Sequence, residues 1–540
     1  MSSDSAWNLL VFRDAKTALS GRTLLNGLVY QLSCPTFDRT RLVDLLLRAG
    51  EWECVLEDRQ LRSSANRVTD AFADALVSGI QPDIRALTRL LQGMPVPEKV
   101  EVSPPEGFAY YALHPLDYAD LVQRLNPQTA LAAVIGIRSI GTALGAVVKA
   151  RLQKQGIRAD RISVRPHGHP YDRCTQLTSS QQLWVTTMLA QGAKFFVVDE
   201  GPGISGSSFL SVGEALVRTG VPEGQIVFLG SRRVEPDKLT APSARERWVR
   251  FHSFHTEGGR YLPTDADANV SGGAWRQFVF RKQEEWPSSW VTLERQKYLS
   301  ADRSRIFKFE GFGRFGTEAN ERAVQAADAG FGPRPFGMCE GFGAYPMIQG
   351  RTLLPSDVSA DVLEQLAKYC VLRREISANS EVDSSELERM LRHNVATEFG
   401  LDLPRDLELD MVHPVIADGR MLPHKWLNAD GKFFKVDNAC HGDDHFFPGP
   451  VDIAWDLAGT VVEWGVDNSG TDLLLRLYRR ESGDDATGRV HAYLLAYAVF
   501  RMAFCKMAAA SVACTLERDR LLRDYQRYRL KAESLFSLLC

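Results

Sequence analysis

Runs of consecutive apolar residues in the middle of the chain predict strands that are buried on both faces. The runs span residues 130–137, 195–198 and 226–229. Such runs are typical of parallel strands that are covered by helices on both sides. The first two are each followed by a loop and by a segment with helical spacing of apolar residues. This order indicates a doubly wound α/β fold.

The first 125 residues have a different pattern, in which apolar residues recur every three or four positions. Residues 41–48, 71–77 and 84–91 show this helical spacing. Proline-rich stretches between residues 94 and 107 predict a loop. We therefore expect a helical N-terminal region over residues 1–125, which carries no catalytic constellation. A lid, a dimer surface and a partner-binding module remain open as its role.

Composition and charge narrow the functional classes. The formal net charge of -3 lacks the basic surplus of a nucleic-acid-binding protein. Nine cysteines without a Cys-x-x-Cys pair argue against a zinc finger or a disulfide framework and for a cytoplasmic protein. The polar start predicts no signal peptide. The most apolar stretch, residues 492–514, contains Arg501 and Lys506, so we expect a buried helix and no membrane partner.

Two acids and a loop of small residues follow the second apolar run. Asp199 and Glu200 end the predicted strand, at the edge where ligands of open α/β sheets usually bind. The glycines and serines of residues 201–208 can expose backbone N–H groups at the start of the next helix. These features predict a phosphate site. The alternative is an ordinary turn between a strand and a helix.

This stretch resembles the phosphoribosyl diphosphate (PRPP) loop of type I phosphoribosyltransferases, although it is slightly longer than the usual pattern. The resemblance implies that Asp199 and Glu200 are catalytic and hold the ribose and Mg²⁺. It also implies that PRPP is bound by Gly203, Ser205, Gly206, Ser207 and Ser208.

A second loop, after the first apolar run, resembles the pyrophosphate loop of the same enzymes. The resemblance implies that Arg138 and Ser139 also bind PRPP, with Arg138 supplying a positive charge. Residues 162–173 form either the flexible hood of that family or a surface hairpin, and the sequence favours neither. We assign residues 126–290 to this phosphoribosyltransferase-like domain.

Residues 291–540 resemble the aminoglycoside-phosphotransferase-like kinases, which have two lobes. A predicted strand with Lys308 precedes a glycine-rich turn and a helix with Glu318 and Glu321. In that family a strand lysine pairs with a helix glutamate and with nucleotide phosphates. The resemblance therefore implies that Lys308 and Glu321, or Glu318 in its place, bind ATP.

Two registers compete for the catalytic loop of the kinase-like domain. One places residues 441–443 (His-Gly-Asp) on the family's His-Gly-Asp loop, but leaves too few residues before the next acid, Asp452. The other takes Asp418 as the catalytic acceptor of a hydroxyl proton, with a predicted hairpin before Asp437. We prefer the second. It implies that His424 and Asp437 hold Mg²⁺, although histidine is a poor ligand for this hard ion.

We thus expect a multidomain chain with α/β and α+β parts: a helical region, a phosphoribosyltransferase-like parallel sheet and a kinase-like domain. The expected function is Mg²⁺-dependent phosphoribosyl transfer from PRPP, or its reverse, coupled to ATP-dependent phosphorylation of a hydroxyl. The expected partners are PRPP, ATP and a small-molecule acceptor, and a homodimer is left open. The alternative is a catalytically degenerate regulatory protein that senses PRPP or nucleotides.

Overall fold

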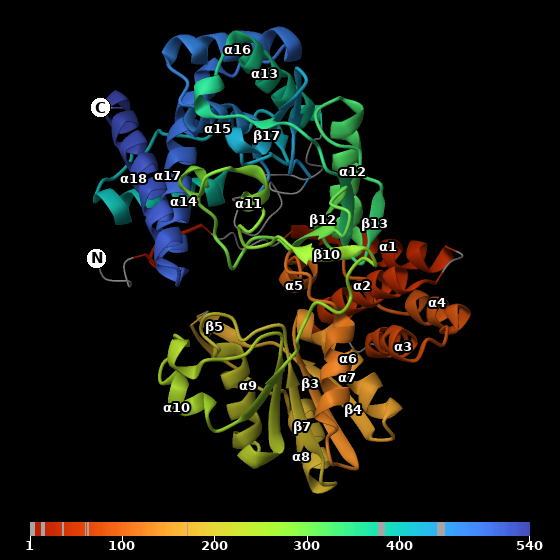
Figure 1. Cartoon of the computed structure of the whole chain (residues 1–540). Coiled ribbons are helices and arrows are strands. Elements are labelled where there is room, and N and C mark those ends of the chain that lie inside the picture. Colours follow the sequence, from red (N-terminus) through yellow and green to blue (C-terminus); the bar gives the residue numbers. More distant parts are fainter. Residues whose placement is uncertain are drawn as a thin grey trace. The chain divides into compact units, whose positions relative to one another are not determined.

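The chain folds into two compact units of mixed α/β structure. The computed structural model describes residues 6–11, 17–34, 37–59, 61, 64–169, 171–375, 384–439 and 449–539. Unit 1 comprises Met1–Ala15, Pro263–Glu310 and Gly316–Cys540, and unit 2 comprises Lys16–Leu262 and Gly311–Phe315. Figure 1 shows the elements of each unit.

A five-stranded parallel sheet forms the centre of unit 2. Its strand order is β4-β3-β7-β8-β9, and every neighbouring pair is parallel. The strands are β3 (Leu131–Ile137), β4 (Arg158–Val164), β7 (Lys194–Val198), β8 (Ile226–Gly230) and β9 (His252–His255). The three predicted apolar runs correspond to β3, β7 and β8, which are almost completely buried.

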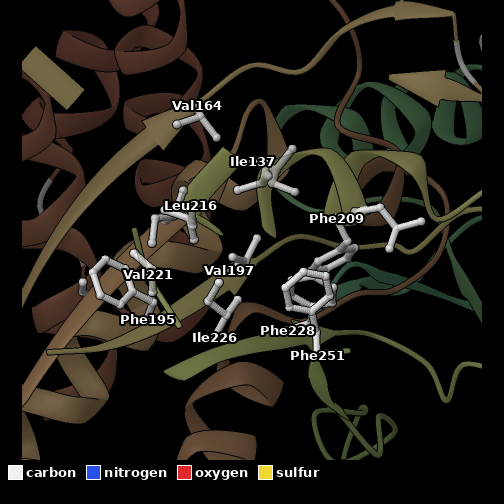
Figure 2. Close-up of a cluster of buried hydrophobic side chains, with 14 of the residues drawn as sticks. Ile137, Val164, Phe195, Val197, Phe209, Leu216, Val221, Ile226, Phe228 and Phe251 are labelled. Carbon is white, nitrogen blue, oxygen red and sulfur yellow. The ribbon is translucent and has the colours of Figure 1, made fainter. Parts of the chain in front are cut away.

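Helices cover both faces of this sheet because its strands are apolar on both sides. On one face, α8 (Ser179–Ala190) and α9 (Ser207–Arg218) pack on a cluster that includes Phe195, Val197 and Phe228 (Figure 2). On the other face lies α7 (Ile140–Lys154). A Cβ atom at Gly136 would lie 2.2 Å from the carbonyl oxygen of Gly141, so only glycine permits this close approach of β3 and the start of α7.

The N-terminal helices belong to the same unit as the sheet. They are α1 (Gly21–Ser33), α2 (Arg39–Asp58), α3 (Ala65–Ser78), α4 (Ile84–Gln92), α5 (Glu106–Ala109) and α6 (Pro115–Leu125), beside a small sheet of β1 (Thr17–Ser20) and β2 (Lys99–Val102). Helices α2, α3 and α6 contact α7. The structure therefore places no boundary at residue 125, where the sequence predicted one, and the main segment of unit 2 runs from Lys16 to Leu262.

A buried ion pair joins this helical layer to the sheet. Arg161 of β4 donates two hydrogen bonds of 2.8 Å to the carboxylate of Glu53 on α2 and a third to Asp70 on α3. The side chains of Arg161 and Glu53 are 2% and 3% exposed. This ion pair adds to the packing of α2, α3 and α6 on α7, which belong to the same unit as the sheet.

Unit 1 contains an antiparallel sheet and a larger helical part. The sheet has the order β10-β11-β12-β14-β13, with strands Ala266–Asn269, Lys297–Ser300, Arg305–Phe309, Phe342–Pro346 and Gly337–Cys339. The short strands are β15 (Arg351–Thr352), β16 (Pro414–Val415), β17 (Trp426–Ala429), β18 (Lys432–Lys435) and β19 (Val451–Asp452). The helices are α11 (Arg276–Val279), α12 (Arg314–Asp328), α13 (Ala360–Glu375), α14 (Ser385–Phe399), α15 (Ala454–Trp464), α16 (Asn468–Ser482), α17 (Thr487–Ser511) and α18 (Thr515–Leu539).

Helix α17 occupies the core of the helical part, as Figure 1 shows for its contacts with α18 and α14. By length and composition it could cross a membrane, but 83% of its apolar window is buried inside the fold. Its Arg501 is buried and paired with Glu463 of α15. This burial agrees with the predicted core helix.

Candidate functional site

The parallel sheet brings the two predicted PRPP loops to one edge. Strands β3 and β7 are neighbours, with Gly136 opposite Val198. The chain leaves β3 toward β4 on one side and passes from β7 to β8 on the other, so the strand order reverses here. Ligands of open α/β sheets bind at such a switch point, outside the carboxyl ends of the strands. Arg138 and Ser139 follow β3, and Asp199 and Glu200 follow β7.

The two acids are half-buried and held by residues of the helical layer. The N–H of Gly107 donates a 2.9 Å hydrogen bond to Glu200 Oε2, and the hydroxyl of Tyr118 donates to the carbonyl of Asp199. Burial raises the pKa of Asp199 to about 7. Burial, with further help from the nearby charges of Glu106 and Asp199, raises the pKa of Glu200 to about 8. Both carboxyl groups are therefore partly protonated near neutral pH, and a cation bound beside them would favour their charged form.

The raised pKa of Glu200 makes the stability of unit 2 depend on pH. The folded chain keeps this proton up to about pH 8, whereas the unfolded chain releases it near 4.5. Between these values the folded state binds more protons, so the free energy of unfolding falls as pH rises. From about pH 5 to about pH 8, we expect wild type to lose roughly 1–2 kcal/mol more than Glu200→Gln, after solvent screening.

Calorimetric melting scans at both pH values measure this difference. The matched control is Glu235→Gln, which changes an exposed glutamate of the same unit. If the stability of wild type and of Glu200→Gln changes equally with pH, the pKa of Glu200 is not raised in the folded chain.

The loop before α9 has the backbone shape of the predicted phosphate cradle, but two of its hydroxyls are occupied. Gly203 and Gly206 adopt left-handed conformations, with φ of +65° and +72°. Ser205 and Ser207 are buried, and Ser205 Oγ donates to Ser207 Oγ over 3.0 Å. These hydroxyls hold the loop together. Ser208, in the first turn of α9, is half-exposed.

The ends of the neighbouring strands supply positive charge at the same edge. Arg232, after β8, donates a 2.8 Å hydrogen bond to the carbonyl of Gly203. Arg138, after β3, is 9% exposed, and its Nε and Nη1 lie 3.4 Å from Asp58 and 3.6 Å from Glu57. Both nitrogens lack a hydrogen-bond partner among the described residues. A buried guanidinium of this kind is suited to bind an anion.

A cavity of about 440 Å³ adjoins the β3 loop. Its lining includes Ser139, Arg165, His167, Cys54 and Asp58. Arg165 follows β4 and forms a two-armed pair with Asp58, with distances of 2.8 and 2.5 Å. His167 begins an antiparallel hairpin of β5 (His167–His169) and β6 (Asp172–Cys174), which is the surface hairpin that the sequence left open.

Unit 1 brings three of the predicted site residues to a second, smaller cavity of about 80 Å³. Lys308 comes from β12, His424 precedes β17, and Asp437 follows β18. The ammonium of Lys308 contacts Asp437 Oδ1, and that of Lys425 donates a 2.6 Å hydrogen bond to Oδ2. His424 stacks on Trp275, with ring centroids 6.0 Å apart. Burial and the nearby lysines hold the pKa of His424 well below its usual value.

Asp418, whose role as proton acceptor stays a prediction, is held inside unit 1 by Lys435 and Tyr369. Its side chain is fully buried, with Lys435 Nζ at 2.9 Å and the hydroxyl of Tyr369 at 2.6 Å. The backbone N–H groups of Asp418 and Gly419 donate to the carboxylate of Asp456. Asp418 therefore anchors the loop and does not line the cavity. The competing register at residues 441–443 lies outside the described residues.

Pairing of Lys308 with Glu318 or Glu321 of α12 stays a prediction, and both glutamates are exposed. Glu321 lies on an exposed face of α12, whereas the buried Glu310 lies 3.5 Å from Lys308. Glu310 also accepts a 2.9 Å hydrogen bond from the hydroxyl of Tyr345. The role of Glu321 in nucleotide binding stays a prediction.

Apart from Lys308, the cations around this cavity were not predicted from the sequence. The basic side chains that line it are Arg295, Lys297, Lys308, Arg420, Lys425 and Arg501. The carboxylates that line it are Glu294 and Asp437. The sequence did contain signals for these cations. Arg295 and Lys297 alternate along one segment, and the proposed catalytic loop contains Arg420 and Lys425.

No protein-family model and no curated protein matches this chain. Solved structures that resemble part of it are small-molecule kinases. Choline kinase LicA from Streptococcus pneumoniae is 16% identical over 44% of this chain and 89% of that one, with a TM-score of 0.31. Plasmodium vivax ethanolamine kinase is 9% identical over 60% and 95%, with a TM-score of 0.32. A putative aminoglycoside phosphotransferase from Ralstonia eutropha is 11% identical over 49% and 97%, with a TM-score of 0.32. At this level, the likenesses establish neither a family nor an activity.

Proposed function

We propose that unit 1 is the ATP site of a small-molecule phosphotransferase. The observation that carries this proposal is the convergence of Lys308, His424 and Asp437 on one cavity from three separate elements. A strand lysine and an aspartate after a hairpin are parts that a kinase-like site uses to hold nucleotide phosphates. Positioning and charge stabilisation supply most of the rate in phosphoryl transfer, and the cations around the cavity suit that task.

Replacement of Lys308 tests the ATP site directly. Lys308→Met is expected to weaken ATP binding by about 10- to 100-fold, because it removes a charged donor from a buried site. Titration calorimetry of the full chain measures this loss. Lys282→Met, which changes an exposed lysine of the same unit, serves as control. ATP binding that is unchanged in Lys308→Met would place the nucleotide elsewhere.

Phosphoryl transfer is tested by the search for a phosphorylated product. Incubation of the chain with ATP and a panel of small hydroxyl compounds, followed by mass spectrometry, detects any acceptor that gains a phosphoryl group. ATP binding without such a product over a broad panel would count against phosphotransferase activity.

PRPP is the ligand that we propose for unit 2. Support comes from the meeting of the β3 and β7 loops at the switch point and from the buried guanidinium of Arg138 beside them. Mg²⁺ is commonly held by one or two carboxylates together with substrate phosphates, and Asp199 and Glu200 fit that donor set. When bound there, the ion would stabilise the charge of a departing diphosphate. The chain's own contribution is to orient the ribose and to bind the phosphates.

A second candidate is a regulatory protein that binds these ligands without turnover. The burial of the Asp418 carboxylate against Lys435 and Tyr369 favours it, because no described carboxylate of that loop faces the cavity. The hydrogen bond from Gly107 to Glu200 favours it too, since it occupies one of the two acids in unit 2. Saturable binding of ATP and PRPP with no ADP, diphosphate or modified acceptor would support this candidate.

A further inference from the structure

The cavity of unit 1 has a marked surplus of positive charge. Six basic side chains line it, against two carboxylates. Of the six, Arg501 pairs with Glu463 and Lys308 lies 3.5 Å from Glu310, and neither of these glutamates lines the cavity. Both carboxylates are already paired: Asp437 with Lys308 and Lys425, and Glu294 with Lys297. Lys308 and Lys425 are 8% and 13% exposed, so these charges are shielded from water. Such a cluster is suited to a ligand with several negative charges.

Magnesium does not fit the residues predicted to hold it. Each oxygen of Asp437 faces an ammonium group, and Lys425 lies 2.6 Å from Oδ2, where an ion bound to that oxygen would have to be. Mg²⁺ requires oxygen ligands in octahedral geometry, and His424 offers a nitrogen. The described residues contain no group of three or more His, Cys, Asp or Glu side chains that could hold a metal.

A further donor lies at the same cavity. The indole nitrogen of Trp275 is buried and makes no hydrogen bond within the part of the chain that is described. The ammonium of Lys425 lies 5.2 Å from the centroid of the same ring. The indole N–H can donate but not accept a hydrogen bond, so its missing partner is an acceptor, such as a phosphate oxygen.

We infer that unit 1 binds the polyphosphate of its nucleotide without a divalent metal, and that Lys425 takes the place of the ion. The inference rests on the ATP site proposed above and specifies its chemistry. Phosphate oxygens replace the carboxylate of Asp437 as partners of Lys308 and Lys425, and Arg420 adds a third positive charge from the same loop as Lys425. The ligand is thus a free nucleoside polyphosphate and not its magnesium complex.

Titration of the full chain with ATP, once in EDTA and once in excess MgCl₂, tests the inference. We expect binding in EDTA at least as tight as in MgCl₂, because metal-free ATP carries more negative charge to the cluster. Lys425→Asn, which supplies an amide oxygen for a metal in place of the ammonium, is expected to bind ATP about 10- to 100-fold more weakly in EDTA. Added MgCl₂ is expected to restore part of that loss.

Two further variants serve as a control for Lys425→Asn and as a second test of the cluster. Lys432→Asn makes the same exchange at an exposed lysine of β18 and is expected to behave as wild type. Arg420→Gln provides a second test of the cluster in case Lys425→Asn does not fold, and is expected to weaken binding in EDTA.

The outcomes separate this inference from the proposed ATP site. ATP binding by wild type only when Mg²⁺ is present overturns the inference and leaves the ATP site standing. Binding in EDTA that neither Lys425→Asn nor Arg420→Gln weakens overturns it as well, because ATP then binds elsewhere. No binding under either condition overturns the inference together with the ATP site.

Discussion

Glu53→Gln is expected to lower the free energy of unfolding of unit 2 by about 3–5 kcal/mol, the usual effect of breaking a buried ion pair from one side. The substitution leaves the guanidinium of Arg161 buried without one of its two carboxylate partners. Burial alone would lower the pKa of Arg161, but Glu53 and Asp70 raise it above its usual value. Because Asp70 remains, the lower end of the range is expected.

Chemical unfolding followed by circular dichroism, together with scanning calorimetry, measures this effect. Glu57→Gln is the matched control, since Glu57 lies one turn further along α2 and its side chain is 46% exposed. A change within about 0.5 kcal/mol is expected for the control. Similar stabilities for the two variants would mean that the Arg161 cluster contributes little to joining helices and sheet.

Asp199→Asn combined with Glu200→Gln is expected to weaken binding of Mg²⁺–PRPP by more than about 100-fold while unit 2 stays folded. The amides keep the size of the carboxyl groups but cannot attract a hydrated cation. They also remove both raised pKa values, so the double variant is expected to lose less stability than wild type as pH rises.

Titration calorimetry with Mg²⁺–PRPP compares wild type with the double variant. Glu235→Gln with Asp237→Asn makes the same two exchanges at exposed positions of the same unit and serves as control. ATP binding by unit 1 is expected to be unaffected. Loss of PRPP and ATP binding together in the Asp199/Glu200 variant would contradict two separate sites. Absence of PRPP binding in wild type would leave the sheet as a scaffold.

The parallel sheet could be predicted well because its signal is local. The run predicted at 130–137 is β3 at Leu131–Ile137, and the run at 195–198 lies within β7 at Lys194–Val198. Short uninterrupted runs of apolar residues are typical of parallel strands that are covered on both faces. The loops at the strand ends follow from chain order alone, so Asp199 and Arg138 could be assigned to one edge.

Other features could not be predicted because they depend on distant partners. Glu53 and Arg161 are 108 residues apart. Nothing in the neighbouring sequence indicates that either side chain is buried. The predicted boundary at residue 125 therefore cut through one unit. In unit 1, the spacing correctly placed a hairpin before Asp437, but spacing does not reveal that the side chain of Asp418 is buried against Lys435.

The hydrogen bond between Gly107 and Glu200 has a consequence for solution measurements. Its donor and acceptor are 93 residues apart, and the donor is a single backbone amide. While the bond is made, that amide is shielded from exchange with solvent deuterium. If a cation or ribose displaces the amide from Glu200 Oε2, we expect the exchange of the amide to become faster. Gly107 is thus a natural reporter, readable by mass spectrometry, of whether the acidic site is occupied.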